Sequence, residues 1–154
     1  MPRPPGGAAP PAPRGPRIAE VRDEEGPRAF EHAIPRGFEL PELDARGAGA
    51  EYGVGVLADD RFRLWVGWEG DRPVSAAAAS AAAGISDVTP VATVPEARRR
   101  GYGAALTWRV TMADPTLPAL LLATDEGLPS YERIGYAAVA RFTLWSRDRP
   151  ARMN

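Results

Sequence analysis

The order of apolar and polar residues predicts alternating strands and helices from about residue 17 onward. Residues 17–23 carry spaced apolar side chains and are expected to form a first strand. In 24–34, Phe30, Ala33 and Ile34 recur at helical spacing, which predicts a helix. The rest of this half is expected to be a short helix or loop over 35–43 and a glycine-rich loop over 45–60.

Three strands are predicted in the middle of the chain. Apolar and polar residues alternate over 61–70, which is typical of a strand with one buried face. A hairpin turn follows and leads into the alanine-rich segment 73–84. Alanine favours helices, but the preceding turn and the lack of an amphipathic stripe favour a second strand. The β-branched segment 85–94 predicts a third strand, in which Pro90 indicates a bulge.

The last third of the chain predicts two helices and two strands. A helix is expected over 103–114, followed by a continuously apolar strand over 118–124. A short helix around 127–134 and a final strand over 137–147 complete the pattern. The strand–helix–strand unit over 85–124 predicts a parallel pair of strands within a mixed α/β sheet.

Composition divides the chain into one domain and two terminal segments. Residues 1–16 hold seven of the 17 prolines and show no apolar periodicity, so we expect a disordered arm there. A chain of 154 residues can bury one core, which we place over 17–148, with a short tail over 149–154. We find no secretory signal and no stretch that could span a membrane, and we therefore expect a cytoplasmic protein.

The residue inventory excludes several kinds of chemistry. The chain has no cysteine, so disulfides, thiolate metal sites and cysteine nucleophiles are ruled out. His32 is its single histidine, and we expect it to be a surface or packing residue. All basic residues are arginine, which rules out a catalytic lysine. The net charge of −1 argues against a nucleic-acid partner.

A run of three arginines and two glycines, RRRGYG, occupies 98–103, between a predicted strand and a predicted helix. Free backbone N–H groups and the positive end of a helix dipole meet at such a position, and glycines let the backbone approach an anion. The run lacks the Gly-Lys-Ser/Thr of a phosphate loop, and a dinucleotide loop would need glycine at Leu106. By itself the run is equally consistent with a solvated turn.

The residues around this run resemble a known signature. Val91 to Ala104, VATVPEARRRGYGA, resemble the acetyl-CoA motif of the GCN5-related N-acetyltransferases. In that motif a strand ends in V-x-P and is followed by R/Q-x-x-G-x-G/A at a helix start. Ser130 to Tyr136, SYERIGY, resemble the family's second block, Y-x-x-x-G-F. The resemblance covers about 17–147 and implies a single-domain mixed α/β sheet, splayed at its centre and flanked by helices.

The resemblance implies a role for each residue of the first block. The backbone of the strand end is expected to pair with the pantetheine arm of acetyl-CoA, and one N–H there to polarise the thioester carbonyl. The backbone amides of the loop are expected to hold the pyrophosphate. The side chains of Arg99 and Arg100 either reach the phosphates or face water. The expected cofactor-binding residues are Val91, Ala92, Thr93, Arg98, Arg99, Arg100, Gly101, Tyr102, Gly103 and Ala104.

In the second block, Tyr131 matches the family's general acid, which would protonate the departing CoA thiolate. A phenol with a pKa of about 10 can supply that proton to a thiolate of similar basicity. The base that deprotonates the amine is left open between Asp87, Glu96 and a water chain. Residues 35–57 are expected to help wall the acceptor site.

We therefore expect an N-acetyltransferase that moves the acetyl group of acetyl-CoA to a primary amine of a small molecule. Direct attack is favoured because no cysteine can carry an acyl-enzyme, and no metal is required. The alternative is a non-catalytic acyl-CoA-binding or regulatory module on the same fold. The residues of the first block most resemble those of a bacterial subgroup of the family. The sequence does not identify the acceptor, and it leaves a homodimer open.

Overall fold

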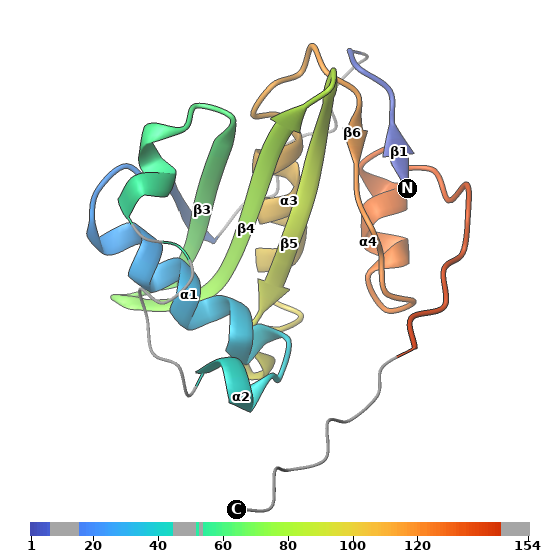
Figure 1. Ribbon diagram of the computed structural model, residues 1–154. Coiled ribbons are helices and arrows are strands. Elements are labelled where there is room, and N and C mark those ends of the chain that lie inside the picture. The colour runs from blue at the N-terminus through green and yellow to red at the C-terminus, as the bar shows by residue number, and fades with distance from the viewer. Residues whose placement is uncertain (7–15, 45–51, 53, 146–154) are drawn as a thin grey trace, which may run out of the picture.

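A mixed, open sheet forms the centre of the protein (Figure 1). The computed structural model describes residues 1–6, 16–44, 52 and 54–145. Within them the sheet has six strands in the order β1-β6-β5-β4-β3-β2, and only β5 and β6 pair in parallel. The strands are β1 (Pro2–Arg3), β2 (Arg17–Glu20), β3 (Phe62–Glu69), β4 (Arg72–Ala82), β5 (Ile85–Thr93) and β6 (Ala119–Leu120). The prediction of a mixed α/β sheet in a single domain is confirmed.

Helices cover both faces of this sheet (Figure 1). On one face, α1 packs against β3 and β4 through a cluster that includes Phe30 and Leu64. On the other face, α3 and the residues at the end of α4 pack against β3, β4 and β5. The helices are α1 (Glu25–Gly37), α2 (Pro41–Asp44), α3 (Tyr102–Thr111) and α4 (Leu128–Arg133), with short 3₁₀ turns η1 (Val54–Ala58) and η2 (Pro95–Ala97).

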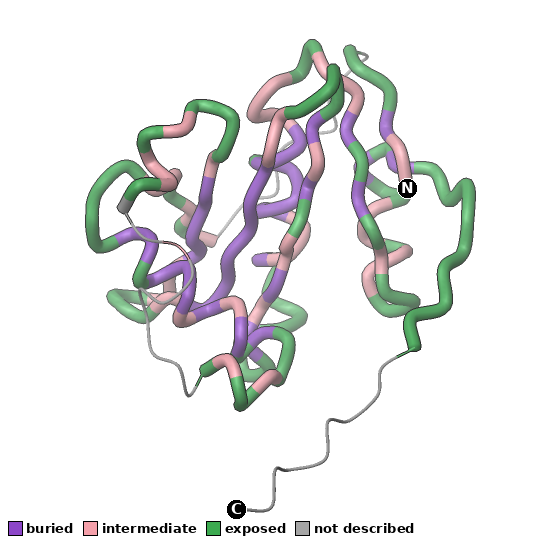
Figure 2. Tube along the Cα trace, viewed as in Figure 1, coloured by how far each residue is buried: buried purple, intermediate pink, exposed green. Residues whose placement is uncertain are grey.

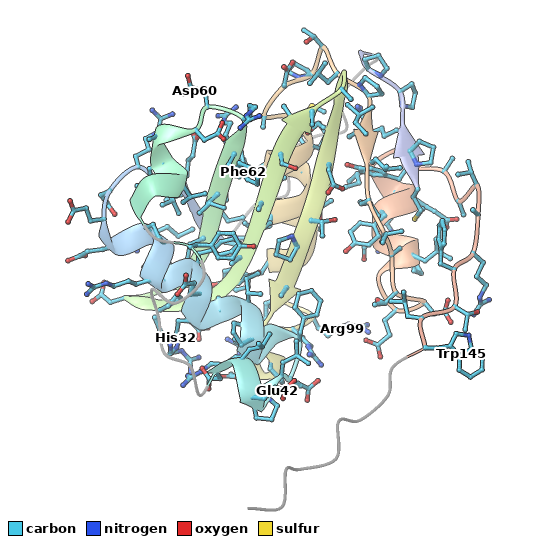
Figure 3. All side chains as sticks on the ribbon, viewed as in Figure 1. His32, Glu42, Asp60, Phe62, Arg99 and Trp145 are labelled. Atoms are coloured by element: carbon cyan, nitrogen blue, oxygen red, sulfur yellow. The ribbon has the colours of Figure 1, made fainter. Side chains whose placement is uncertain are left out.

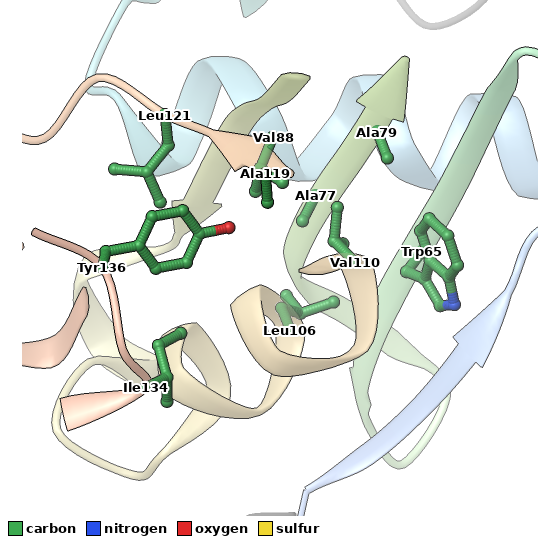
Figure 4. Packing of buried hydrophobic residues seen from close by; sticks show 10 residues of the cluster. All are labelled: Trp65, Ala77, Ala79, Val88, Leu106, Val110, Ala119, Leu121, Ile134 and Tyr136. Atoms are coloured by element: carbon green, nitrogen blue, oxygen red, sulfur yellow. The ribbon is translucent and has the colours of Figure 1, made fainter. Parts of the chain in front are cut away.

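The alanine-rich segment is strand β4, as the turn before it indicated. Ala76 and Ala78 face α1 and are buried. Ala77 and Ala79 face α3 and are buried as well (Figure 4). Small side chains on both faces let a helix approach the central strand from each side. Pairing with β3 and β5 therefore outweighs the helix propensity of alanine.

The predicted bulge in β5 is confirmed. Two residues of β5, Thr89 and Pro90, stand opposite one residue of β4. As a result Val88 and Val91 both pack against the same apolar cluster, although they are three positions apart. Asp87, which simple alternation would place on the face of Val91, lies on the opposite face.

The sheet splays between its two parallel strands. Pairing of β5 with β6 is confined to Ser86–Ala119 and Asp87–Leu120. Beyond these pairs β5 continues to Thr93 without a partner on this side among the described residues. The strand predicted over 118–124 is thus too long by five residues, because no neighbouring strand accompanies its second half. The expected splay at the centre of the sheet is present.

The first residues of the chain contradict the expected disordered arm. β1 pairs antiparallel with β6, and the backbone N–H of Leu121 donates to the oxygen of Met1 at 3.0 Å. The buried Arg3 side chain donates a hydrogen bond from Nε to the oxygen of Ile134 at 3.0 Å. The prediction is therefore wrong for residues 1–6, while 7–15 lie outside the described residues.

The final strand predicted over 137–147 is wrong where the structure describes it, because residues 137–145 form no strand. The N–H of Ala137 donates to the oxygen of Pro2, but β1 is only two residues long and offers no further partner. The segment therefore leaves its large apolar side chains in solvent, and Leu144 and Trp145 are 90% and 92% exposed (Figure 2). Residues 146–154, including the expected tail, lie outside the described part.

Candidate active site

The loop predicted to hold a phosphate connects η2 to α3. Arg98 is extended, Arg99 adopts a left-handed conformation with φ 64°, and Gly101 at the N-cap of α3 has φ 87°. The two left-handed residues turn the backbone sharply, so that the loop curls over the start of the helix. Glycine is favoured at position 101 because a side chain would be strained at this φ.

This loop presents a run of unused hydrogen-bond donors. Among the described residues, no backbone N–H from Arg99 to Ala104 donates a hydrogen bond, and no side chain caps α3. The first acceptor in use is the oxygen of Gly101, which receives the N–H of Ala105 at 3.0 Å. Free donors at the positive end of a helix form an anion site, so the geometry suits a phosphate group.

The three arginines of the loop differ in what their side chains contact. The Arg98 guanidinium donates hydrogen bonds to protein oxygens at the ends of α1 and β5. Arg100 forms an ion pair with Glu69. Arg99 projects into solvent at the end of β5 (Figure 3), and no described residue pairs with it. Of the three, Arg99 has the side chain that is free to meet an anion.

The unpaired edge of β5 leads to this loop. Val91, Ala92 and Thr93 pair with β4 on one side only, so their other side can accept a ligand. Behind them the buried Ser75 hydroxyl donates to the oxygen of Ala92 at 2.7 Å and shares a hydrogen bond with Thr93 Oγ1 at 2.8 Å. Ser75 therefore holds the strand end, a role that its alanine-rich surroundings gave no reason to expect.

Tyr131 lies on α4 and packs against the apolar cluster that also contacts Val91. Its ring meets the Tyr136 ring edge to face at 6.3 Å. Burial raises the pKa of the Tyr131 phenol above its usual value of 10.0. Its hydroxyl has no hydrogen-bond partner in the described part of the chain, whereas Tyr136 shares a 2.7 Å hydrogen bond with Thr111. Tyr131 therefore keeps its proton at neutral pH, and its hydroxyl is not bonded to any described residue.

Solved structures with the same arrangement of elements include several acetyltransferases. An aminoglycoside acetyltransferase, meta-AAC0020, from an uncultured soil metagenomic sample in complex with sisomicin aligns with a TM-score of 0.64 at 11% identity, over 87% of this chain and 96% of that one. A GCN5-related N-acetyltransferase from Ralstonia eutropha aligns with a TM-score of 0.56 at 20% identity, over 86% of this chain and 99% of that one. The chain has the GCN5-related N-acetyltransferase fold.

A third solved structure of this fold contains a bisubstrate analogue that includes coenzyme A. AAC(6')-Iy in complex with the bisubstrate analogue CoA-S-monomethyl-acetylneamine aligns with a TM-score of 0.57 at 14% identity, over 88% of this chain and all of that one. No protein-family model matches the sequence, and the comparison with curated proteins finds no match. The resemblance to acetyltransferases is therefore established at the level of the fold.

Within this acetyltransferase fold the structure does not single out a general base. Asp87 accepts a weak 3.4 Å hydrogen bond from the Thr89 hydroxyl and lies on the face of the sheet away from Val91. Glu96 pairs with Arg72 at the surface. His32 lies half-exposed on α1, and burial lowers its pKa below 6.5. Asp87, Glu96 and water all stay candidates.

The segment predicted to wall the acceptor site is described in part. α2 and the first four residues of η1 belong to it, whereas 45–51 and 53 lie outside the described residues. Tyr52 packs edge to face on Phe30 at 5.0 Å, and its N–H donates to the Glu31 carboxylate. Across the described residues, no group of three or more acidic or histidine side chains could hold a metal ion, and no helix could cross a membrane.

Burial of Tyr136 predicts that its phenol loses its proton at an unusually high pH. Burial raises the pKa of Tyr136 to about 12, against an ordinary value of 10.0. Because the pKa of Tyr136 is higher in the folded than in the unfolded state, the contribution of its protonated phenol to the free energy of unfolding is complete below pH ~10. That contribution is lost as the pH rises through about 12. We expect a late step in the near-ultraviolet phenolate absorbance that is missing in Tyr136→Phe. Ionisation of all tyrosines near pH ~10 in the folded protein would contradict this.

Proposed function

We propose that this protein is an N-acetyltransferase that moves the acetyl group of acetyl-CoA to a primary amine of a small molecule. The observation that carries the proposal is the run of unused N–H groups from Arg99 to Ala104 beside the unpaired edge of β5. A pyrophosphate fits the first feature and an extended amide-bearing arm fits the second. The acetyltransferases that share the fold, one of them with sisomicin and one with a CoA bisubstrate analogue, support the proposal.

In the proposed reaction the amine nitrogen attacks the thioester carbonyl carbon, the C–S bond breaks and CoA leaves as a thiolate. A backbone N–H at the end of β5, among Val91 to Thr93, stabilises the developing oxyanion. Tyr131 donates its phenolic proton to the thiolate, and no described residue competes for its hydroxyl. The proton released by the amine leaves through water or a carboxylate. Each product then carries one proton, and the tyrosine regains its own from solvent.

Binding and turnover test this proposal separately. Calorimetry is expected to show acetyl-CoA binding with micromolar affinity, in the range common for such substrates. Mass spectrometry of an amine panel that contains sisomicin, spermidine and a peptide N-terminus is then expected to show one added acetyl group on a small-molecule amine. Binding without acetylation of any amine would favour the non-catalytic acyl-CoA module. Absence of binding would overturn both. A cytoplasmic location and a bacterial source both stay predictions.

The exposed C-terminal segment supports the prediction of a homodimer. Residues 138, 140, 142 and 144 are apolar and would share one face of a strand, and residues 138–145 lack backbone partners in the described chain. On this face the Phe142 side chain alone covers about 150–250 Å². Burying the segment in two copies supplies a large part of the roughly 800 Å² per partner that a stable interface needs.

We therefore expect a dimer in light scattering, with the segment of one copy paired with that of the other. Phe142→Glu is expected to give monomers, because it places a charge on the apolar face of the segment. The matched control is Phe62→Glu, at an exposed phenylalanine on β3 far from Trp145 (Figure 3). A monomeric wild-type protein, or a dimer that survives Phe142→Glu, would contradict the prediction.

A further inference from the structure

One arginine side chain joins the end of α1 to the end of β5. Arg98 Nη2 donates to the backbone oxygen of Gly37, the last residue of α1, at 3.0 Å. Its Nε donates to the oxygen of Thr93, the last residue of β5, at 3.2 Å. Nη2 also pairs with the Glu39 carboxylate at 3.0 Å. The planar guanidinium thus contacts three acceptors that come from two separate parts of the chain.

The two elements that Arg98 joins are also in direct backbone contact. A Cβ built on Gly37 would lie 2.7 Å from Ala92 Cβ and 2.9 Å from the Thr93 nitrogen, so only glycine fits there. Glu39 adopts a left-handed conformation with φ 57°, which ends the helix and turns the chain toward α2. The turn from α1 to α2 is therefore pressed against the part of β5 whose outer edge is free.

These contacts engage two of the three nitrogens of the Arg98 guanidinium and leave only Nη1 without a partner among the described residues. Nε donates to one protein oxygen and Nη2 to two, and the Glu39 carboxylate offsets part of the positive charge. The motif places Arg98 among cofactor-binding residues, whereas its neighbour Arg99 has the side chain without a partner. The side chain of Arg98 and that of Arg99 consequently have different tasks.

We propose that Arg98 is a positioning residue that couples the acceptor side of the site to the acetyl-CoA side. It holds the α1–α2 turn, residues 36–44, on the end of β5, so that fixing Thr93 also fixes the turn. This inference rests on the proposed function, in which acetyl-CoA pairs with Val91 to Thr93 and residues 35–57 wall the acceptor. Acetyl-CoA bound along Val91 to Thr93 would then also stabilise the wall that the amine meets.

Hydrogen exchange with and without acetyl-CoA tests the coupling and needs no knowledge of the acceptor. In the wild-type protein acetyl-CoA is expected to slow exchange both in 99–104 and, by about tenfold, in 36–44. In Arg98→Met the protection of 99–104 is expected to remain and that of 36–44 to disappear. Acetyl-CoA affinity is expected to stay within about threefold of wild type, because no phosphate contact is lost.

Two further variants make the result specific to Arg98. Arg99→Met removes a neighbouring cation and is expected to leave the protection of 36–44 intact. If Arg98→Met does not fold, Glu39→Gln keeps the arginine and weakens one of its three contacts, and it is expected to reduce that protection in part. For an amine acetylated by the wild-type protein, Arg98→Met is expected to raise the KM of the amine about tenfold, whereas the KM of acetyl-CoA stays unchanged.

Different results would contradict the coupling through Arg98 and the proposed function. Equal protection of 36–44 in Arg98→Met and wild type would overturn the coupling, and so would a wild-type protein in which acetyl-CoA protects only 99–104. A loss of acetyl-CoA affinity of more than about tenfold in Arg98→Met would show that Arg98 binds the phosphates instead. A wild-type protein that acetyl-CoA does not protect anywhere would overturn the proposed function and this inference with it.

Discussion

Gly101→Glu is expected to abolish acetyl-CoA binding, with a loss of affinity of about a hundredfold or more. Gly101 stands at the N-cap of α3 with φ 87°, in the middle of the donors that we assign to the pyrophosphate. A glutamate there would place a negative charge beside the phosphates and a side chain where the backbone must approach them. Isothermal calorimetry measures the loss directly.

A second glycine provides a matched control for this variant. Gly84, in the turn between β4 and β5, also has a left-handed φ of 78°, and nothing lies within 4 Å of a Cβ built on it. Gly84→Glu therefore carries the same charge change and a similar strain of about 1–2 kcal/mol, but at the other end of β5. It is expected to lower the melting temperature as Gly101→Glu does and to keep acetyl-CoA affinity. Unchanged affinity in Gly101→Glu would refute the assignment of this loop.

Tyr131→Phe is expected to lower turnover by about a hundredfold and to leave acetyl-CoA affinity within about twofold of wild type. The hydroxyl that is removed has no hydrogen-bond partner among the described residues, so its loss should not destabilise the fold. The effect therefore reports the lost proton donor. Stopped-flow or steady-state rates between pH ~6 and ~9 measure it with an amine that the wild-type protein acetylates.

The neighbouring tyrosine serves as the control. Tyr136→Phe removes a hydroxyl that shares a buried 2.7 Å hydrogen bond with Thr111. It is expected to cost about 1 kcal/mol of unfolding free energy, because the Thr111 hydroxyl loses its partner, and to change turnover little. The opposite pattern, with full turnover in Tyr131→Phe across this pH range, would remove Tyr131 from the general-acid role.

Local signals in the sequence predicted most of the elements and the core of the site. Alternation predicted β3, the turn before the alanine run predicted β4, and Pro90 predicted the bulge in β5. The loop from Arg98 to Gly103 was located because strand, turn glycine and helix start follow each other directly in the chain. Such features depend on neighbours in sequence, which is why pattern and motif suffice to find them.

Features that depend on distant partners were missed or misjudged. Residues 1–6 have the composition of a disordered arm, yet they are held by β6 and by Ile134, more than a hundred positions away. The segment over 137–145 has the alternation of a strand, but strand structure needs an edge to pair with, and β1 offers only two residues. Composition and periodicity describe what a segment favours by itself and do not reveal whether a partner is present.

For this protein the sequence by itself determined the mixed α/β architecture, the position of the candidate phosphate loop and the choice of Tyr131 as candidate acid. Only the tertiary structure decided which of the three loop arginines is free and which are engaged. Arg98 meets Gly37 and Arg100 meets Glu69, and these acceptors lie 61 and 31 positions away along the chain. A side chain's partner is set by which elements the fold brings together, and three adjacent identical residues cannot disclose it.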